Sequence, residues 1–449
     1  MATRAFTIAE LAPRLRRREL SPADLVERCL VQIDRLEPAI RAWVFVDRQG
    51  ARQAARQAAD DLAAGRDRGP LHGMPLAIKD IIDVAGWPTR AGSKLTDDRP
   101  AKADAPLVAS LRAAGAILLG KAVTTEFAWV DPPPTRNPWN HARTPGGSSS
   151  GPAAAVASGM CVAAIGSQTG GSITRPATFC GVAGCKPTHG AVPLAGIVPL
   201  SPRLDHPGPI ARSVADLRIL LQVIADTTAR SRLGPLTPDP SPARGEGGMR
   251  LALVEGYFHD DATSDVWAAT LTAVDRLAEA GATVERIVLD ADLRRIVALH
   301  RRLMSAEAAA SHRELFARRG AEFAPSIGAL VREGMQVTSD WLAEAIAEQQ
   351  AFRAAMNDVA QRFDALIMPA TLSTAPGTET TGDPRFNSPW SFAGLPTVSL
   401  PCSLAPDGLP CGLQLVGRWL GDFPLLDVAQ WCERQLAFDA VPAGCEGLA

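Results

Sequence analysis

The sequence predicts an α/β protein. Short apolar runs that suit buried strands alternate along the chain with longer amphipathic or Ala-rich segments that suit helices, and this alternation is typical of the class. With 449 residues, the chain is long enough to bury a large core. Its formal net charge of −2 argues against a general binder of nucleic acids or membrane surfaces.

The first elements follow from caps, periodicity and turn residues. Ser21 suits the N-cap and Pro22 the first position of a helix that we expect to reach about Glu37. The apolar run 76–79 lies between Gly and Pro punctuation and fits a buried strand. The same reasoning predicts strands over 42–46 and 116–119 and helices over 49–64 and 104–114.

Residues 144–190 are dominated by Gly, Ser, Ala and Thr, a composition that also suits a flexible linker. We do not expect a linker here, because a good helix start at Pro152 is followed by an apolar run at 162–165. The stretch 234–248 is too rich in Pro and Gly for a helix or central strand, so a disordered surface insertion is predicted there. Beyond it the alternation resumes, with strands over 251–254, 283–289, 365–368, 397–400 and 412–416 and helices over 264–280, 341–363 and 424–436.

The sequence indicates a cytoplasmic protein with reduced thiols. Residues 1–20 suit an amphipathic helix rather than a signal peptide, and no apolar run approaches the roughly 18 residues of a membrane helix. Eight cysteines in so long a chain do not suggest a disulfide scaffold. Cys180, Cys185 and His189 lack the spacing of a zinc site, so we expect buried thiols and no metal.

Two Gly/Ser clusters lie close together, at 146–151 and 169–172. Successive glycines let backbone N–H groups converge on an anion, such as a phosphate or a developing oxyanion. The phosphate alternative is weak, because no Lys-Ser/Thr pair follows either cluster. Gly147-x-Ser149-x-Gly151 matches the nucleophile elbow of α/β-hydrolases in form only, since turn residues rather than a strand precede it.

Lys79 is the best candidate for activating a serine. Only five of the 46 basic residues are lysines, so we ask whether Arg could replace each one. Lys79 ends an apolar run, where desolvation would lower its pKa and favour the free amine, a form that Arg cannot adopt. Strand alternation would point Asp80 to the other face. A strand-end lysine paired with a carboxylate is an equal alternative on this evidence.

Several segments together resemble the amidase signature family. The most specific is the run over 144–159, Thr-Pro-Gly-Gly-Ser-Ser-Ser-Gly-Pro-Ala-Ala-Ala-Val-Ala-Ser-Gly, followed by Gly-Gly-Ser-Ile and Pro-Ala-Thr-Phe-Cys-Gly-Val-Ala-Gly-Cys-Lys-Pro-Thr. Further matching segments at 69–80, 120–128 and 386–396 extend the resemblance over nearly the whole chain. It implies one α/β/α domain over 1–449, built on a large mixed sheet that helices cover.

The resemblance also implies a Ser–cis-Ser–Lys catalytic triad. Matched residue by residue, Ser172 is the nucleophile, Ser148 is the bridging cis-serine, and Lys79 is the base. Ser149 and Ser150 match accessory positions of the signature. The implied oxyanion hole consists of the backbone N–H groups of Thr169, Gly170, Gly171 and Ser172.

The sequence departs from the usual family pattern beside the nucleophile. Gln168 stands where an Asp is usual, Thr174 stands where an Arg is usual, and Arg175 follows one place later. The loss of an acidic and a basic residue together suggests a missing structural ion pair rather than a missing catalytic group. The triad is intact, but substrate preference does not transfer from other members.

The leading expectation is a stand-alone amidase that hydrolyses a small carboxamide to a carboxylate and ammonia or an amine. The resemblance implies an acyl-enzyme and neither metal nor cofactor. The expected partner is a small-molecule amide, with no nucleic acid or membrane, and a homodimer is left open. Phe127 and Trp390, from their residue type, and Ser149, from its accessory position, are the expected substrate contacts.

Three alternatives stay open. The first is the glutaminase (A) component of a tRNA-dependent amidotransferase, which needs partner subunits. Residues 331–346 lack the Arg- and Tyr-rich character expected of that component, and Tyr257 is the only tyrosine of the chain. The second is a catalytically silent relative that acts as a binding protein, which would not need the complete triad. The third is a Ser-His-Asp esterase with Ser149 as its nucleophile.

Overall fold

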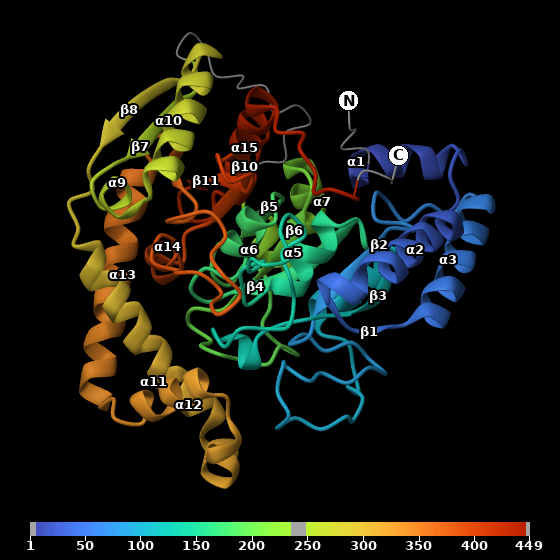
Figure 1. Ribbon diagram of the computed structural model, residues 1–449, viewed down its shortest axis with the longest axis horizontal. Coiled ribbons are helices and arrows are strands. Elements are labelled where there is room, and N and C mark those ends of the chain that lie inside the picture. The colour runs from blue at the N-terminus through green and yellow to red at the C-terminus, as the bar shows by residue number, and fades with distance from the viewer. Residues whose placement is uncertain (1–5, 235–247, 446–449) are drawn as a thin grey trace.

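A computed structural model describes residues 6–234 and 248–445 (Figure 1). This part of the chain forms a single α/β domain, in which fifteen α-helices surround one mixed sheet of eleven strands. The predicted α/β class and the large mixed sheet are thus confirmed. Apart from its two end glycines, the predicted insertion at 234–248 lies outside the described residues.

The sheet follows the order β1-β3-β2-β4-β6-β5-β10-β11-β9-β7-β8 from one edge to the other. Strand β2 is parallel to β3 and β4, and β7 is parallel to β8 and β9, whereas the other neighbours are antiparallel. The strands are β1 (Trp43–Val46), β2 (Pro75–Lys79), β3 (Ile117–Ala122), β4 (Ala163–Gln168), β5 (Ala183–Lys186), β6 (His206–Ala211), β7 (Arg250–Val254), β8 (Thr283–Ile287), β9 (Ala365–Pro369), β10 (Thr397–Leu404) and β11 (Pro410–Val416).

The helices connect these strands and cover the sheet. Figure 1 shows α11, α12 and α13 gathered on one side of the molecule, far from α1, α2 and α3. The helices are α1 (Ile8–Arg16), α2 (Pro22–Ile40), α3 (Arg48–Ala63), α4 (Pro106–Ala113), α5 (Ser150–Ala157), α6 (Thr174–Phe179), α7 (Val214–Ile224), α8 (Thr227–Arg230), α9 (Tyr257–Asp261), α10 (Ser264–Glu279), α11 (Leu293–Arg319), α12 (Pro325–Gly334), α13 (Ser339–Ala360), α14 (Ser388–Ala393) and α15 (Asp422–Leu436), with short 3₁₀ turns η1 (Glu126–Ala128) and η2 (Gly320–Glu322).

The elements predicted from local pattern are present, with ends that shift by a few residues. Ser21 caps α2 by accepting the N–H of Ala23, and Pro22 opens the helix. The predicted buried strand is β2, whose residues are all buried. The amphipathic N-terminal segment forms α1, and residues 1–5 lie outside the described chain. Cap, turn and periodicity signals are local, so they are readable without the fold.

Two elements that shape the site are not predicted by local sequence patterns. Strand β6 lies between β4 and β5 although it contains Pro207 and Pro209. Because these prolines are two positions apart, their missing N–H groups face the same side of the strand, and Gly208 between them can still donate its N–H to the other side. The long helix α11 is the second. Its many Arg and Ala residues and its buried His residues interrupt the apolar face, so the sequence shows no clear helical periodicity there.

The cysteine side chains lie in the interior of the described structure. All eight cysteines belong to the described residues, and each is buried and outside any disulfide bond. Within the described ranges, no group of three or more His, Cys, Asp or Glu side chains is arranged to hold a metal ion. In the same part of the chain, no helix combines the length and apolar character needed to cross a membrane.

The topology brings the two Gly/Ser clusters and Lys79 together. Strands β2 and β4 are parallel neighbours, with Ile78 opposite Ile165. Lys79 is the last residue of β2, and the second Gly/Ser cluster follows the end of β4, so both lie at the same edge of the sheet. The first cluster leads into α5 at Ser150. This edge, where parallel strands end, is where the site forms.

Candidate active site

Lys79 presents a buried amine to two serines. Its Nζ atom lies 2.8 Å from Ser148 Oγ and 2.9 Å from Ser167 Oγ, with the Ser167 carbonyl oxygen at 3.4 Å. Burial holds the pKa of Lys79 well below the ordinary lysine value, and the negative charge of Asp205 opposes this shift only in part. The environment therefore favours an uncharged amine beside a hydroxyl group.

Asp80 faces away from Lys79, as strand alternation predicts. Its carboxylate pairs with Lys121 at 2.9 Å, and both side chains are buried. Within the described residues, no carboxylate forms an ion pair with Lys79. The alternative of a lysine neutralised by a carboxylate thus fits Lys121 and not Lys79.

Ser148 lies in the turn before α5, and its side chain is fully buried. The Gly147–Ser148 peptide bond is cis, as expected from the resemblance. Arg175 donates from Nη2 to the Gly147 carbonyl at 2.8 Å and from Nε to the Thr381 carbonyl at 3.2 Å. The start of α6 therefore holds the turn that carries Ser148.

Ser172 lies in the loop between β4 and α6, and the main chain ties it to the first cluster. The N–H of Ser149 donates to the Ser172 carbonyl at 3.3 Å. Residues 169–172 line a cavity of about 660 Å³. Their four consecutive N–H groups have no acceptor anywhere in the described chain. Such a run of unpaired donors beside a cavity suits a developing oxyanion.

Gln168 replaces the usual carboxylate with an amide that both accepts and donates. Its Oε1 accepts the N–H groups of Ile173 and Thr174 at 2.9 Å each, at the start of α6. Its Nε2 donates to Ser391 Oγ at 3.2 Å. A carboxylate could cap the helix in the same way, but it could not donate to Ser391. The departure from the family pattern thus exchanges charge for a neutral hydrogen-bond network.

Arg175, the displaced basic residue, is buried without a carboxylate partner among the described residues. Burial lowers the pKa of its guanidinium to about 10. Its hydrogen-bond acceptors are main-chain carbonyls. The structural ion pair that the usual family pattern suggests is therefore absent from the described residues.

The cavity wall contains both apolar and polar residues. Trp129, Val130 and Leu200 contribute apolar surface, together with Val297 and Met304 from α11. The segment 379–388, which ends at the first residue of α14, contributes six polar residues: Glu379, Thr380, Thr381, Asp383, Arg385 and Ser388. The site can therefore hold a molecule with both apolar and polar parts.

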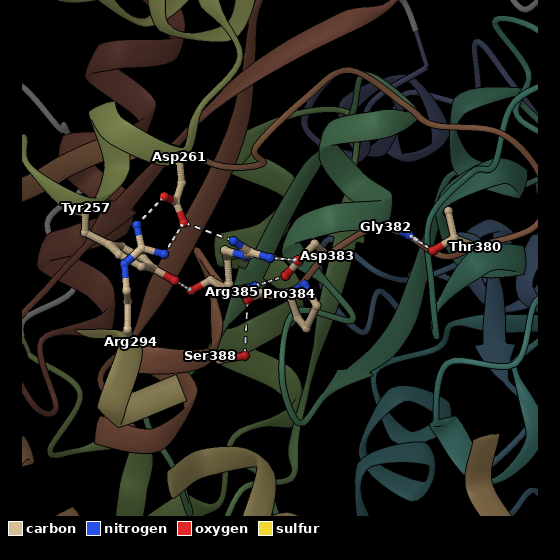
Figure 2. Close-up of polar contacts among 9 residues, drawn as sticks. All are labelled: Tyr257, Asp261, Arg294, Thr380, Gly382, Asp383, Pro384, Arg385 and Ser388. Carbon is tan, nitrogen blue, oxygen red and sulfur yellow. Dashed lines mark hydrogen bonds and ion pairs between the residues drawn. The ribbon is translucent and has the colours of Figure 1, made fainter. Parts of the chain in front are cut away.

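Asp261 joins two arginines of the cavity wall (Figure 2). It pairs with Arg294 at 2.5 Å and with Arg385 at 3.0 Å, and these arginines hold its pKa below the usual range. Arg385 also pairs with Asp383 at 2.7 Å, and Arg294 lies over the ring of Tyr257 at 5.3 Å. These contacts tie α9, α11 and the 379–388 loop into one wall.

The three expected substrate contacts lie in the packed interior rather than in the cavity wall. Phe127 packs against Phe323 with ring centroids 5.4 Å apart, and Trp390 stacks on Phe258 at 6.3 Å. The hydroxyl of Ser149 bonds to the main chain of β4. Large aromatic rings serve cores as readily as pockets, so residue type alone could not separate the two.

Ser167, His300 and Ser391 contact the site although they were not among the residues expected there. Ser167 lies on β4. Strand alternation places its side chain on the same face as that of Thr169, so the sequence could have indicated that Ser167 faces the site. His300 bonds to Thr169 and Ser391 bonds to Gly170. No local pattern connects residues that are 131 and 221 positions apart.

The comparisons with known proteins show the family of the chain. The amidase family model matches residues 24–426. The chain is 37% identical over 477 residues to the A component of the glutamyl-tRNA(Gln) amidotransferase of Roseiflexus castenholzii, covering 96% of this chain and 95% of that protein. It is 37% identical over 424 residues to an amidase of Pseudomonas putida, covering 90% of each. A solved amidase structure superposes with a TM-score of 0.86 at 31% identity, covering 96% of this chain and 99% of that one. The chain therefore belongs to the amidase signature family, whose members include enzymes that cleave carbon–nitrogen bonds of amides.

Proposed function

We propose that the protein hydrolyses a carboxamide through an acyl-enzyme on Ser172. The observation that carries the proposal is the buried Lys79 amine within hydrogen-bond distance of Ser148, beside a loop that combines Ser172 with four unpaired N–H groups. A neutral lysine can activate a serine where an arginine cannot.

The oxygens around Lys79 support its role as the base. A neutral amine has two N–H groups and one lone pair. The hydroxyl and carbonyl of Ser167 can accept the two N–H groups, which leaves the lone pair for the hydroxyl proton of Ser148. Ser148 in turn takes the proton of Ser172 as the Ser172 oxygen attacks the amide carbon.

The rest of the cycle follows from the same groups. The tetrahedral oxyanion accepts hydrogen bonds from the unpaired N–H groups of residues 169–172. The C–N bond then breaks, and the proton held by Lys79 returns through Ser148 to the leaving ammonia or amine. Water attacks the Ser172 ester with the same base, which releases the carboxylate and restores the serine.

The cavity indicates the size and character of the amide. Its volume of about 660 Å³ falls within the range of pockets that hold drug-sized ligands, roughly 300–1,000 Å³. We therefore propose a small-molecule amide that is larger than the simplest aliphatic amides. One part of the substrate is apolar and packs near Val297 and Met304, and another part is polar and lies near Arg294 and Asp383.

A second candidate function is the glutaminase (A) component of an amidotransferase that uses glutamine. Its support is the 37% identity to the Roseiflexus amidotransferase component over nearly the whole length of both chains. The two candidates differ in what the isolated chain can do. A stand-alone amidase turns over simple amides without partners, whereas an amidotransferase component requires its partner chains for its full reaction.

The test is a panel of aliphatic, aryl and amino-acid amides given to the purified protein alone, with and without hydroxylamine. Ammonia release together with hydroxamate formation supports an acyl-enzyme in a stand-alone amidase. Release confined to glutamine favours the amidotransferase component. No release from any amide, with a folded protein, supports a silent relative and contradicts the proposal.

A further inference from the structure

The N–H groups beside Ser172 can stabilise an oxyanion only if their peptide planes are held in place. In a trans peptide the carbonyl of one residue and the N–H of the next point in opposite directions. The Thr169–Gly170 and Gly170–Gly171 bonds are trans, since the one cis bond of the described chain is Gly147–Ser148. Whatever binds the Thr169 carbonyl therefore also sets the direction of the Gly170 N–H.

His300 binds that carbonyl. It is buried on α11, and its Nε2 lies 2.9 Å from the Thr169 carbonyl oxygen. A carbonyl can only accept, so Nε2 carries the hydrogen. Burial lowers the pKa of His300 to about 4, and the ring is neutral near pH 7. The ring also lies in the cavity wall, with Cε1 within 3.6 Å of the position that a Gly170 Cβ would occupy.

Ser391 binds the next carbonyl in the same way. Its Oγ donates to the Gly170 carbonyl at 2.8 Å and accepts from Gln168 Nε2 at 3.2 Å. Ser391 belongs to α14, and α14 packs against α11. Two carbonyls of the loop are thus held by two helices that contact each other, and the N–H groups of Gly170 and Gly171 remain unpaired in the described chain.

We propose that His300 is a positioning residue for the oxyanion hole, which it orients by anchoring the Thr169 carbonyl. The inference rests on the proposed acyl-enzyme chemistry. His300 forms no hydrogen bond with Ser172 or Lys79 in the described structure, so it acts through the Thr169–Gly170 peptide. The anchored peptide stabilises the transition state, where the oxyanion forms, and contributes little to binding of the neutral amide.

The test compares His300→Ala, His300→Gln and His300→Asn on the amide that the wild-type protein hydrolyses best. Gln can place an amide N–H near the position of Nε2, whereas Asn is too short to do so. Removal of one whole oxyanion donor costs about 10²–10³-fold in kcat. Misorientation of one donor should cost roughly 10- to 100-fold in kcat with KM nearly unchanged. His300→Gln should recover most of the loss, and His300→Asn should recover little.

A second readout uses phenylboronic acid, which adds to an active-site serine to give a tetrahedral anion. His300→Ala should weaken this inhibitor by a factor similar to its loss in kcat. His312 is the matched control, because it lies on the same helix, is buried, has a pKa that burial lowers to about 4, and lies outside the cavity wall. His312→Ala should leave both readouts near wild type.

Each outcome decides the inference. Unchanged kcat in His300→Ala, or a loss that His300→Gln does not restore while inhibition by phenylboronic acid stays at the wild-type level, overturns it. If His300→Ala does not fold, the pair His300→Gln and His300→Asn carries the comparison. Failure of the proposed function is separate, because it appears as absence of hydroxamate with the wild-type protein.

Discussion

The Nζ atom of Lys79 lies 2.8 Å from the Oγ atom of Ser148, and both side chains are fully buried. In the described chain, the hydrogen-bond partners of Nζ are the hydroxyl oxygen of Ser148 and the hydroxyl and carbonyl oxygens of Ser167. No carboxylate is among them. Nζ can accept the Ser148 proton only while the amine is uncharged. Position 79 therefore requires a base that can exist in neutral form, and positive charge alone does not meet this requirement.

Lys79→Arg should be nearly as inactive as Lys79→Ala. Arginine keeps its proton, so neither variant can act as the base, and kcat should fall by roughly 10²- to 10⁴-fold in both. Steady-state kinetics on the best amide measure the loss. Lys102→Arg, at an exposed lysine, is the control and should match wild type. Substantial turnover by Lys79→Arg would show that the lysine is only structural.

The pH dependence of kcat/KM should show the lowered pKa of Lys79. The active form is the neutral amine, so activity falls as pH falls through this pKa. Because burial holds the pKa well below 10.5, the fall begins at a lower pH than an ordinary lysine would give. Asp205, whose own pKa is raised to about 6 by burial, is charged above that pH and raises the pKa of Lys79. Asp205→Asn should move the acid limb to lower pH, and a shift to higher pH would contradict the assignment.

Ser172→Ala and Ser149→Ala should behave differently. Ser172→Ala removes the nucleophile, so hydroxamate formation should disappear. Ser149 instead bonds to the main chain of β4, at 3.1 and 3.2 Å, and its loss should cost about 1–3 kcal/mol of stability while measurable turnover remains. Hydroxylamine trapping and thermal unfolding of both variants separate the two effects. The reverse pattern would favour an esterase with Ser149 as nucleophile.

Gln168→Leu should destabilise the protein. The change leaves the N–H groups of Ile173 and Thr174 without their acceptor and removes the donor to Ser391. An unpaired buried polar group costs about 1–3 kcal/mol, so a clear drop in the urea midpoint is expected. Thr174→Val, which keeps the backbone N–H at the same site, is the control and should change the midpoint little. Equal stability of Gln168→Leu and wild type would remove the proposed role of the amide.

Val297→Phe should change which amides are accepted. Val297 lies in the cavity wall, so a larger side chain reduces the volume available and should raise KM for bulky aryl amides more than for short aliphatic ones. Phe127→Leu is the matched change in the core and should lower the free energy of unfolding without altering the ratio between substrates. Ratios of kcat/KM for the two amide classes give the result. A changed ratio of kcat/KM in Phe127→Leu but not in Val297→Phe would show that the Phe127 ring contacts the substrate.

Much of the fold could be predicted because its signals are local. The cap at Ser21, the buried run of β2 and the alternation that turns Asp80 away from Lys79 each depend on neighbours within a few residues. Strand β6 could not be predicted in this way, because its prolines disfavour a strand and only its place between β4 and β5 makes it one. The resemblance to a family supplied the triad residues, which composition and periodicity could only suggest.

The sequence by itself determined most of the helix and strand segments and the two Gly/Ser clusters, and its resemblance to a family identified Lys79, Ser148 and Ser172 as the residues to test. Tertiary structure decided which side chains face the cavity. It placed Phe127 and Trp390 in the core, and it brought His300 and Ser391 onto carbonyls of a loop 131 and 221 positions away. The physical reason is that caps and strand alternation act over a few residues, whereas contacts between distant segments depend on how α11, α14 and the sheet pack together.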